Sequence, residues 1–467
     1  MKLKKIFLTA LSSILFLTSI PDISIIESHA VNYVPKGAVA SVTVNNETSY
    51  YYDNTTSGGA EAMWNTAMTG SSAMIVLYED WISSYGTRFG TGNGFAFDGV
   101  LCVPSGHEIT IDLNGCSINR NLEFAIENGE VIHVQNGGVL NITDTNTELG
   151  NSGKITGGNS LDGAGGIYVE TGGTVNMWGG NITGNNTEGS GGGVLLVGEE
   201  SNFNMSGGTI SDNTASQCGG GVALSGGNFK LANGIISDNH AQSGGGIYAQ
   251  AGKVELSGGS LTENIAVHGG GILVNNTAEL VLRSKASIQN NIASGENRLG
   301  GGILAMSNMP IRVSGKITIT DNSADGVQSN LVFLQDSNSD TGVSCYLQNA
   351  GLESSAKIGV SLSGKVRTAI FAPSWSGETD CFSCDVINYK LEYKNNDMML
   401  CRVTSYATLV GNNNMRTIII IGVLIALAVI AVLVLIFKKS KNIQDQTETP
   451  EKKKVKIAKR KSAKNKK

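Results

Sequence analysis

Long amphipathic helices are missing from the centre of this chain, and their absence sets the first limit on its fold. No segment between residues 165 and 322 repeats apolar residues at helical spacing, which excludes the tetratricopeptide, ankyrin and HEAT classes of repeat protein. Charged residues (16%) and proline (6 residues) are also scarce, yet the chain carries too many aliphatic residues to be disordered. A folded chain with few helices is therefore expected.

Glycine-led segments occupy the place where helices are missing. Each is followed by two short apolar runs and then by a polar turn that carries an asparagine. These asparagines recur every 25 to 31 residues, a period that is typical of a solenoid when it is made of short strands and turns. The asparagines are Asn185, Asn213, Asn239, Asn264, Asn291 and Asn322. The pattern predicts an all-β fold, a right-handed parallel β-helix of about nine coils spaced ~4.8 Å apart.

Alternation within the repeat predicts three strands per coil and an aliphatic core. In the first strand Ile167 and Val169 share one face and Tyr168 takes the other. The second strand offers inward pairs such as Val175 and Met177, and the third begins with one aliphatic residue. One coil cannot bury such a face alone, so neighbouring coils must stack. We expect the glycine pairs at corners, and the asparagines in left-handed turns with amides bonded from coil to coil.

Both ends of the chain carry membrane-targeting patterns. Residues 1–30 read as a signal peptide, with early lysines, an apolar run and a small-residue cleavage site at Ser28-His29-Ala30. Residues 417–437 are an uninterrupted apolar stretch that is long enough to span a bilayer. The tail, 438–467, holds 13 of the 34 lysines and arginines, which predicts a cytoplasmic tail and an extracellular solenoid. No Leu-Pro-x-Thr-Gly sorting signal precedes the apolar stretch, so we expect a single-pass protein anchored in the cell membrane by that helix.

The remaining boundaries follow from shifts in pattern. Residues 31–69 should form an N-terminal arm and a short capping helix, with Trp64 as a plug over the first coil. The β-helix is expected over residues 70–335, an irregular C-terminal β cap over 336–404, and a linker over 405–416.

Charge limits the partners. The exported part is acidic, which argues against nucleic acids and glycosaminoglycans and is compatible with cations, neutral glycans or proteins. The basic tail is interpreted as a topology signal that also contacts anionic lipid headgroups, with a cytoplasmic partner as an alternative. It lacks aromatic residues to stack on bases, so nucleic-acid binding is not expected.

Seven cysteines in an exported chain predict some disulfides and one thiol left over. Cys381 and Cys384 form a Cys-x-x-Cys without a surrounding thioredoxin-like βαβ pattern. A local disulfide clip, or bridges to Cys345 and Cys401, is favoured over redox chemistry.

Several motifs resemble bacterial surface proteins with a right-handed, pectin-lyase-like parallel β-helix. They are Thr110-Ile111-Asp112-Leu113-Asn114-Gly115, Gly137-Gly138-Val139-Leu140-Asn141-Ile142, the glycine-led repeats and Lys357-Ile358-Gly359-Val360. The resemblance covers roughly residues 70 to 400 and implies the fold. It implies an adhesin or a polysaccharide lyase or hydrolase only loosely, because the motif residues are structural ones.

Catalytic motifs of the related enzymes are absent. The chain has no Gly-His-Gly or Arg-Ile-Lys element, and its arginines fall at different phases of the repeat. His107, His133, His240 and His268 do not share a column either. An enzyme is therefore the less favoured reading, and no cofactor is required by any motif.

Two columns of side chains remain as candidate sites. Asp212, Asp238 and Glu263 precede the turn asparagines of consecutive coils and either hold a calcium ion or bond to local backbone. The outward positions of the first strand are mostly apolar, whereas the other two faces are polar. The proposed ligand-binding face consists of Tyr168, Leu195, Tyr248, Leu273 and Leu304.

The expected function is recognition of an extracellular glycan or protein, as an adhesin or a wall-associated module. A calcium-assisted polysaccharide lyase or hydrolase and a passive surface spacer are the alternatives. Two alternatives remain for the apolar column: a loop or a neighbouring molecule covers it, or aliphatic stacking merely stiffens the sheet.

Overall fold

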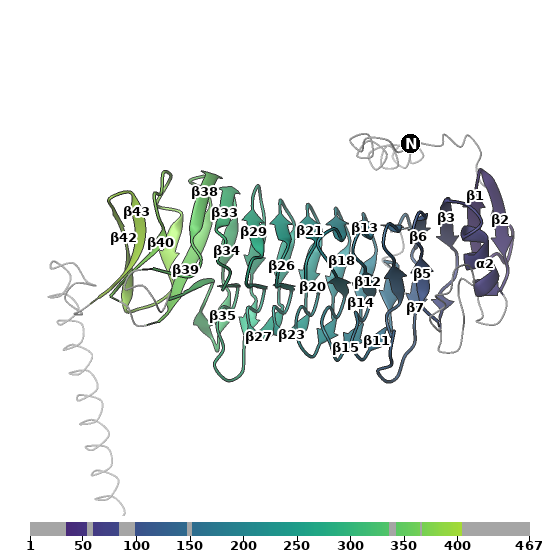
Figure 1. Cartoon of the computed structure of the whole chain (residues 1–467), viewed down its shortest axis with the longest axis horizontal. Helices are drawn as coiled ribbons and strands as arrows, with labels where there is room; N and C mark the ends of the chain where they lie inside the picture. Colours follow the sequence, from purple (N-terminus) through teal and green to yellow (C-terminus); the bar gives the residue numbers. More distant parts are fainter. Residues whose placement is uncertain are drawn as a thin grey trace, which may run out of the picture.

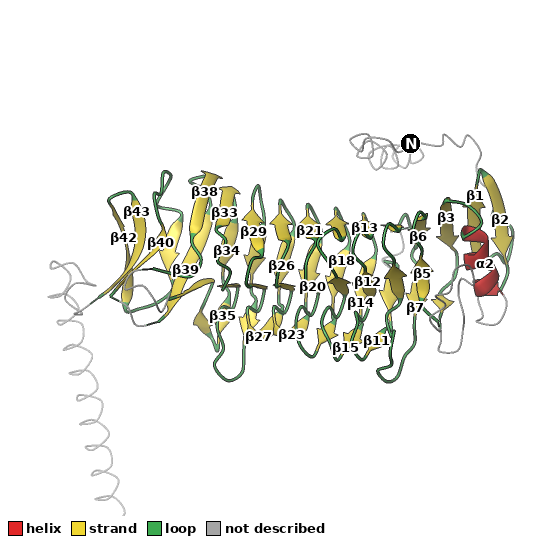
Figure 2. Ribbon diagram, in the orientation of Figure 1, coloured by secondary structure: helices red, strands yellow, loops and turns green. Residues whose placement is uncertain are grey.

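The protein is an elongated all-β solenoid of the right-handed type, with its coils stacked along one axis (Figure 1). This computed structural model describes residues 34–53, 59–83, 99–146, 152–335, 342–364 and 367–403. Strands and turns make up nearly all of it, and the one helix in the described ranges lies at the N-terminal end of the stack (Figure 2). The predicted signal peptide, linker, membrane helix and tail lie outside these residues. No helix in the described ranges has the length and apolar character that crossing a bilayer requires.

Each regular coil contains four strands, one more than the sequence predicts. The first strands are β5 (Leu101–Val103), β8 (Ile132–Val134), β12 (Ile167–Val169), β16 (Val194–Leu196), β20 (Val222–Leu224), β24 (Ile247–Ala249), β28 (Ile272–Val274), β32 (Ile303–Ala305) and β37 (Leu331–Leu334). The second strands are β3 (Ser72–Leu77), β6 (Glu108–Asp112), β9 (Val139–Thr143), β13 (Thr174–Met177), β17 (Asn202–Met205), β21 (Asn228–Leu231), β25 (Lys253–Leu256), β29 (Glu279–Leu282), β33 (Ile311–Gly315) and β38 (Leu347–Leu352). From β3 to β38 they pair in parallel, which gives ten coils.

The third and fourth strands lie on either side of the asparagine turn. The third strands are β4 (Trp81–Ile82), β7 (Ser117–Asn119), β10 (Lys154–Thr156), β14 (Asn181–Thr183), β18 (Thr209–Ser211), β22 (Ile235–Ser237), β26 (Ser260–Thr262), β30 (Ser287–Gln289), β34 (Thr318–Thr320), β39 (Lys357–Ser363) and β41 (Phe382–Cys384). The fourth are β11 (Asn159–Ser160), β15 (Asn186–Thr187), β19 (Thr214–Ala215), β23 (His240–Ser243), β27 (Ile265–His268), β31 (Ile292–Ala293) and β35 (Ser323–Ala324), with β36 (Val327–Gln328) antiparallel to β35. The fourth strand has only two residues in most coils and carries no aliphatic alternation, so a search for periodicity does not reveal it.

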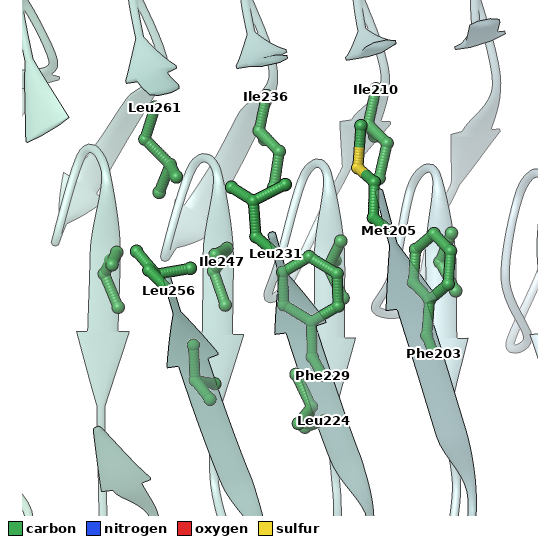
Figure 3. Packing of buried hydrophobic residues seen from close by; sticks show 14 of the residues in the cluster. Phe203, Met205, Ile210, Leu224, Phe229, Leu231, Ile236, Ile247, Leu256 and Leu261 are labelled. Atoms are coloured by element: carbon green, nitrogen blue, oxygen red, sulfur yellow. The ribbon is translucent and has the colours of Figure 1, made fainter. Parts of the chain in front are cut away.

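Stacked aliphatic side chains fill the interior, as the alternation predicts. Ile167 pairs with Val194, Val194 with Val222, and the column continues without a shift to Leu331. All of these side chains are fully buried. Figure 3 shows how the second strand adds Phe203 and Phe229, whose ring centroids lie 5.3 Å apart. Each coil thus buries its apolar face only against the coils above and below it.

Close packing between coils explains the glycine runs. At Gly221 a Cβ would lie 2.7 Å from the carbonyl oxygen of Gly246 in the next coil, a distance that no side chain tolerates. Gly219, two residues earlier, adopts a φ of 64°, which favours glycine. Both reasons for glycine at the corners are therefore confirmed.

The N-terminal end is closed by a hairpin and the predicted helix. Strand β1 (Ala40–Val44) pairs antiparallel with β2 (Glu47–Tyr51) and with β3, so the hairpin extends the second-strand sheet. Helix α2 (Gly59–Ala67) places Trp64 in the core, fully buried and edge-on to Trp81 with centroids 6.2 Å apart. The prediction of Trp64 as a plug residue is confirmed.

At the other end, parallel pairing continues past residue 335. Strand β38 pairs with β33, β39 pairs with both β34 and β37, and β41 pairs with β39. A small antiparallel sheet of β40 (Thr368–Ala372), β43 (Asp397–Arg402) and β42 (Tyr389–Lys394) follows. Part of the segment expected as an irregular cap is thus regular solenoid.

A buried column of asparagine amides runs along the turn between the third and fourth strands. Each amide donates from Nδ2 to the Oδ1 atom of the next coil, for example from Asn213 to Asn239 at 3.0 Å, and the backbone N–H of Asn213 bonds to the same oxygen at 3.1 Å. The coil-to-coil amide bonding is therefore confirmed. The left-handed residue, however, is not the asparagine but the residue before it, such as Asp212 with a φ of 54°. The residues just before the asparagines, such as Asp212, therefore supply the left-handed turn of each coil.

The buried column ends on a carboxylate. Asn322 donates to Asn330 at 2.9 Å, and Asn330 donates through its backbone N–H (2.8 Å) and Nδ2 (2.9 Å) to the two oxygens of Asp385. The Ser361 hydroxyl donates to the same carboxylate at 3.0 Å. Gly359 lies so close that a Cβ would collide with both Asn330 and Asp385, which explains the glycine of the Lys357-Ile358-Gly359-Val360 motif.

Candidate ligand-binding face

The outward side chains of the first strands form one continuous column, as predicted. Tyr168 pairs with His133 on one side and Leu195 on the other, and the register continues unchanged along the solenoid. The column is Cys102, His133, Tyr168, Leu195, Ala223, Tyr248, Leu273, Leu304 and Val332. We call this surface the first-strand face.

The first-strand face is accessible only at three positions of its N-terminal half, since Cys102, His133 and Ala223 in that half are buried. Tyr168, Leu195 and Tyr248 are half-buried, but Leu273 and Leu304 are only 3% and 1% exposed. These two leucines and Val332 form a small cluster of their own, against which Leu299 and Leu334 pack. The expectation that Leu273 and Leu304 lie on an exposed stripe is therefore wrong, because a segment just before β32 brings Leu299 over them.

A cluster of ionisable groups lies in the N-terminal half of the first-strand face. The Nδ1 atom of His133 is 2.9 Å from Glu130 Oε1, and its Nε2 atom is 2.9 Å from Glu170 Oε1. Glu130 and His133 are buried, whereas the Glu170 side chain is 39% exposed. The second oxygen of Glu170 accepts the backbone N–H of Asn136 at 3.0 Å. The imidazole thus joins two coils through two carboxylates.

This geometry assigns the protonation state of His133. An ionised carboxylate only accepts hydrogen bonds, so this geometry favours the charged imidazole, in which both ring nitrogens donate. Burial alone would lower the pKa of His133, but its hydrogen bonds to Glu130 and Glu170 and their negative charges raise that pKa above the ordinary value. The Tyr168 ring stacks on the imidazolium with centroids 4.8 Å apart, an arrangement that favours the cation.

The Tyr168 hydroxyl is a hydrogen-bond donor at this end of the face. Burial raises its pKa, and the charges of Glu170, Glu130 and Asp162 raise it further. It therefore stays protonated at neutral pH. Because His133 stacks on one side of the ring, the polar groups at this place are the hydroxyl of Tyr168 and the partly exposed carboxylate of Glu170.

Tyr248 stands in a second, uncharged polar group three coils away. Its hydroxyl interacts with Asn275 and Cys218, and Cys218 also interacts with Ser190. Burial raises the pKa of the Cys218 thiol, and the hydrogen bonds from Ser190 and Tyr248 only partly oppose this. Three coil steps separate the two tyrosines by ~14 Å, so an extended ligand lying along the solenoid axis could reach both.

The carboxylates proposed for calcium lie on the turn and do not form a preorganised site. Asp212, Asp238 and Glu263 all adopt positive φ, from 54° to 59°, and they alternate between exposed and half-buried. Within the described residues, no three carboxylate, imidazole or thiol groups are close enough to hold a metal ion. The calcium site stays a prediction, and the turn conformation supplies a separate reason for short polar residues in this column.

Cysteine chemistry also differs from the expectation. Cys116, Cys218, Cys345, Cys381, Cys384 and Cys401 are free thiols, so the predicted clip and bridges are not formed. The Cys381 thiol donates to the carbonyl of Glu378 at 3.4 Å, and Cys384 contacts the carbonyls of Val386 and Tyr389. Burial is the main cause that raises the pKa of Cys381 to about 11, and the charges of Glu378 and Asp380 add to it. A thiol with such a pKa is a poor nucleophile at neutral pH.

The sequence analysis missed Glu130, His133 and Glu170, although a signal was available. Aligning Ile132-His133-Val134 with Ile167-Tyr168-Val169 places His133 directly beside Tyr168 in the outward column. The histidines share no column with one another, so His133 stands out only beside Tyr168. Glu130 and Glu170 lie outside the strands, where alternation gives no direction for a side chain.

Comparisons with known proteins add no name to this geometry. No protein-family profile, no curated protein and no solved structure matches the chain. What is established is the fold, a parallel β-solenoid of about ten turns.

Proposed function

We propose that this protein is a cell-surface recognition module that binds an extracellular glycan or protein over the N-terminal half of the first-strand face. The observation that carries the proposal is the cluster of His133, Tyr168 and Glu170. It combines a charge-assisted framework, fixed by hydrogen bonds of 2.9 Å, with a partly exposed carboxylate and a protonated phenol. Fixed polar groups on an aromatic surface are typical of binding sites.

The surface location rests on the sequence. The signal peptide (1–30), the apolar stretch (417–437) and the basic tail (438–467) support a single-pass protein with its solenoid outside and its tail against anionic lipid headgroups. The resemblance to pectin-lyase-like bacterial surface proteins is compatible with this arrangement. Labelling of intact cells with an impermeant reagent would report the topology.

The experiment that tests recognition is an array of glycans and extracellular proteins probed with the full-length chain in detergent micelles. We expect a ligand whose binding falls at least tenfold in the double variant Tyr168→Ser plus Glu170→Gln. Thr209→Ala, an exchange on the third strand away from this face, is the matched control and should leave binding within twofold. Binding that survives the double variant unchanged contradicts the assignment of the face.

A polysaccharide lyase or hydrolase is the second candidate, and the same cluster favours it. The partly exposed carboxylate of Glu170 receives a hydrogen bond from the buried imidazolium, and a carboxylate beside a proton donor is a group that general acid–base chemistry uses. Incubation of neutral and acidic polysaccharides with the purified chain, with release of reducing ends or unsaturated products as the readout, distinguishes turnover from binding. Turnover abolished by His133→Gln would support the enzyme, whereas turnover abolished by Asp238→Asn would support a calcium-assisted site at Asp212, Asp238 and Glu263.

A passive spacer is the third reading. A spacer predicts that no ligand binds on the array and that no polysaccharide is turned over.

A further inference from the structure

A second surface, on the outer side of the second strands, carries amides in register, which range from buried at Asn141 to exposed at Asn204 and Asn228. Asn176 donates from Nδ2 to Asn141 Oδ1 at 2.9 Å, and Asn204 donates to Asn176 at 3.0 Å. Two positions earlier in the strand, Asn228 donates to Asn202 at 3.1 Å. Because Val175, Phe203 and Phe229 alternate with these residues and point inward, all of the amides project to the outside.

The longer of these two amide chains, Asn141–Asn176–Asn204, has a direction of donation that is fixed at its first residue. Asn141 donates to the Glu108 carboxylate at 2.7 Å, and only the NH2 side of an amide can face a carboxylate. Each carbonyl oxygen must therefore point toward the following coil. At Asn204 and Asn228 the chains stop, and no described group bonds to either carbonyl oxygen. Each of these exposed amides also keeps one N–H that no described residue uses.

The alternation of β13, continued by one residue, places Trp178 on the same outer side, where the fold gives no reason for a tryptophan. It follows Met177, whose partners are Ile142 and Met205, so its neighbours in the adjacent coils are the small residues Thr143 and Ser206. The Trp178 side chain is half-buried. Because these neighbours are small, part of the indole remains accessible and adds an apolar surface beside the outer amides.

We propose that the patch of Trp178, Asn202, Asn204 and Asn228 binds a neutral, N-acetylated glycan. An acetamido group offers one N–H and one carbonyl oxygen, which match the donor and acceptor that each terminal asparagine leaves open. The indole supplies an apolar surface for the non-polar side of a sugar ring. Exposed Glu199 and Glu200 lie in the turn before β17, and exposed Lys230 pairs in register with Asn204. Charges of both signs therefore surround the patch, which suits a neutral ligand.

This surface is separate from the first-strand face, since it lies on the second strand of each coil. A negative result at one of the two sites therefore does not contradict the other. Variants of Tyr168 and Glu170 should leave the amide patch intact, and variants of Trp178 should leave the first-strand face intact.

Tryptophan emission gives a direct test, because the chain contains four tryptophans and three of them, Trp64, Trp81 and Trp375, are fully buried. A change in emission on binding therefore reports on Trp178. We would titrate the full-length chain in detergent micelles with the hexamer of β-1,4-linked N-acetylglucosamine, and in parallel with the glucose hexamer of the same linkage. The expected result is saturable quenching by the first sugar and at least tenfold weaker binding of the second.

Variants then locate the site by calorimetry, which does not depend on the indole. Trp178→Ala should weaken binding of the N-acetylated hexamer at least tenfold, and Asn204→Ala plus Asn228→Ala about fivefold. Asn186→Ala removes an exposed amide from the fourth strand and should have no effect beyond twofold. Equal affinity for both hexamers, no binding of either, or binding that Trp178→Ala leaves unchanged would overturn the proposal. Tyr168→Ser plus Glu170→Gln should not alter it, and a loss there would reassign the glycan to the first-strand face.

Discussion

The inner chain of asparagine amides and the longer of the two outer chains, Asn141–Asn176–Asn204, differ in direction and in burial. The inner chain donates toward the C-terminus and ends on Asp385, whereas the outer chain donates toward the N-terminus and ends on Glu108. Every inner asparagine from Asn185 to Asn322 is fully buried, but Asn204 of the outer chain is exposed. The same side chain at the same coil spacing thus occurs in two environments.

The difference teaches that burial, not the amide ladder itself, decides how much the ladder stabilises the fold. Inside, one oxygen of Asn239 accepts both the backbone N–H and the Nδ2 group of Asn213, and its own Nδ2 donates to Ile210 and Asn264. No water replaces these partners if the amide is removed. Outside, water replaces any lost bond, so the net contribution of each amide is small.

The largest effect is therefore expected for Asn239→Ala. Removal of this side chain leaves the backbone N–H of Asn213 without its acceptor and removes one bond each from the Ile210 carbonyl and the Asn264 oxygen, which keeps the backbone N–H of residue 239. The free energy of unfolding should fall by about 3 kcal/mol, since each buried unpaired group costs ~1–3 kcal/mol. Urea denaturation of the full-length chain, followed by the circular dichroism of the β-sheet, measures the loss. If Asn239→Ala lost less unfolding free energy than an outer-chain variant such as Asn176→Ala, the inner chain would not be the more stabilising of the two.

The end of the inner chain should tolerate even a conservative exchange poorly. In Asp385→Asn one carboxylate oxygen becomes an NH2 group, and it faces either the backbone N–H or the Nδ2 group of Asn330, which are both donors. Asn330 cannot turn its amide over, because its oxygen already accepts two bonds from Asn322. A loss of about 2 kcal/mol is expected from one buried donor without an acceptor. If Asp385→Asn unfolds at the same urea concentration as the natural chain, the assigned direction of the inner chain is wrong.

His133 provides a third link between coils, which differs from both amide chains because it is charged. Its pKa is raised in the folded state, so its stabilisation is fully present below the ordinary histidine value of about 6.5 and is lost as the pH rises through the folded pKa. Glu130, Glu170, Tyr168 and Cys102 are the titratable groups beside it.

The expected contribution is about 1.5 kcal/mol, the size of a hydrogen bond to a charged group. Urea midpoints between pH 5.5 and 9 would show it as a stability difference between the natural chain and His133→Gln that shrinks toward high pH. A difference that stays constant across this range would show that the imidazole packs without titrating.

The sequence predicted the parts of the fold that depend on repetition. Stacked positions such as Ile167 and Val194 recur with the coil, and their aliphatic character follows directly from the need to bury them. The left-handed residue could not be told from its asparagine neighbour, because aspartate and asparagine both adopt positive φ. The fourth strand was not predicted because it has only two residues in most coils, which are too few to show a period.

The candidate site was only partly visible for a similar reason. Tyr168 was placed on the correct face because it alternates with Ile167, but Glu130 and Glu170 lie in turns, where direction depends on the fold of the particular coil. The covering of Leu304 by Leu299 is a contact between segments with no shared period. Such contacts are set by turn geometry, which alternation does not encode.

The smallest effect is expected at the end of the outer chain, and it forms a matched pair with Asp385→Asn. Glu108→Gln also exchanges a carboxylate for an amide, but its only partners from the ladder are the Nδ2 donor of Asn141 and the solvent. The carbonyl oxygen of glutamine accepts that donor, and its NH2 group turns to water, so no group is left unpaired. The free energy of unfolding should change by less than about 0.5 kcal/mol. Measured side by side under the same conditions, the two exchanges separate chemistry from environment: equal losses would mean that the outer carboxylate is as confined as the inner one, and that the outer ladder is part of the fold instead of part of its surface.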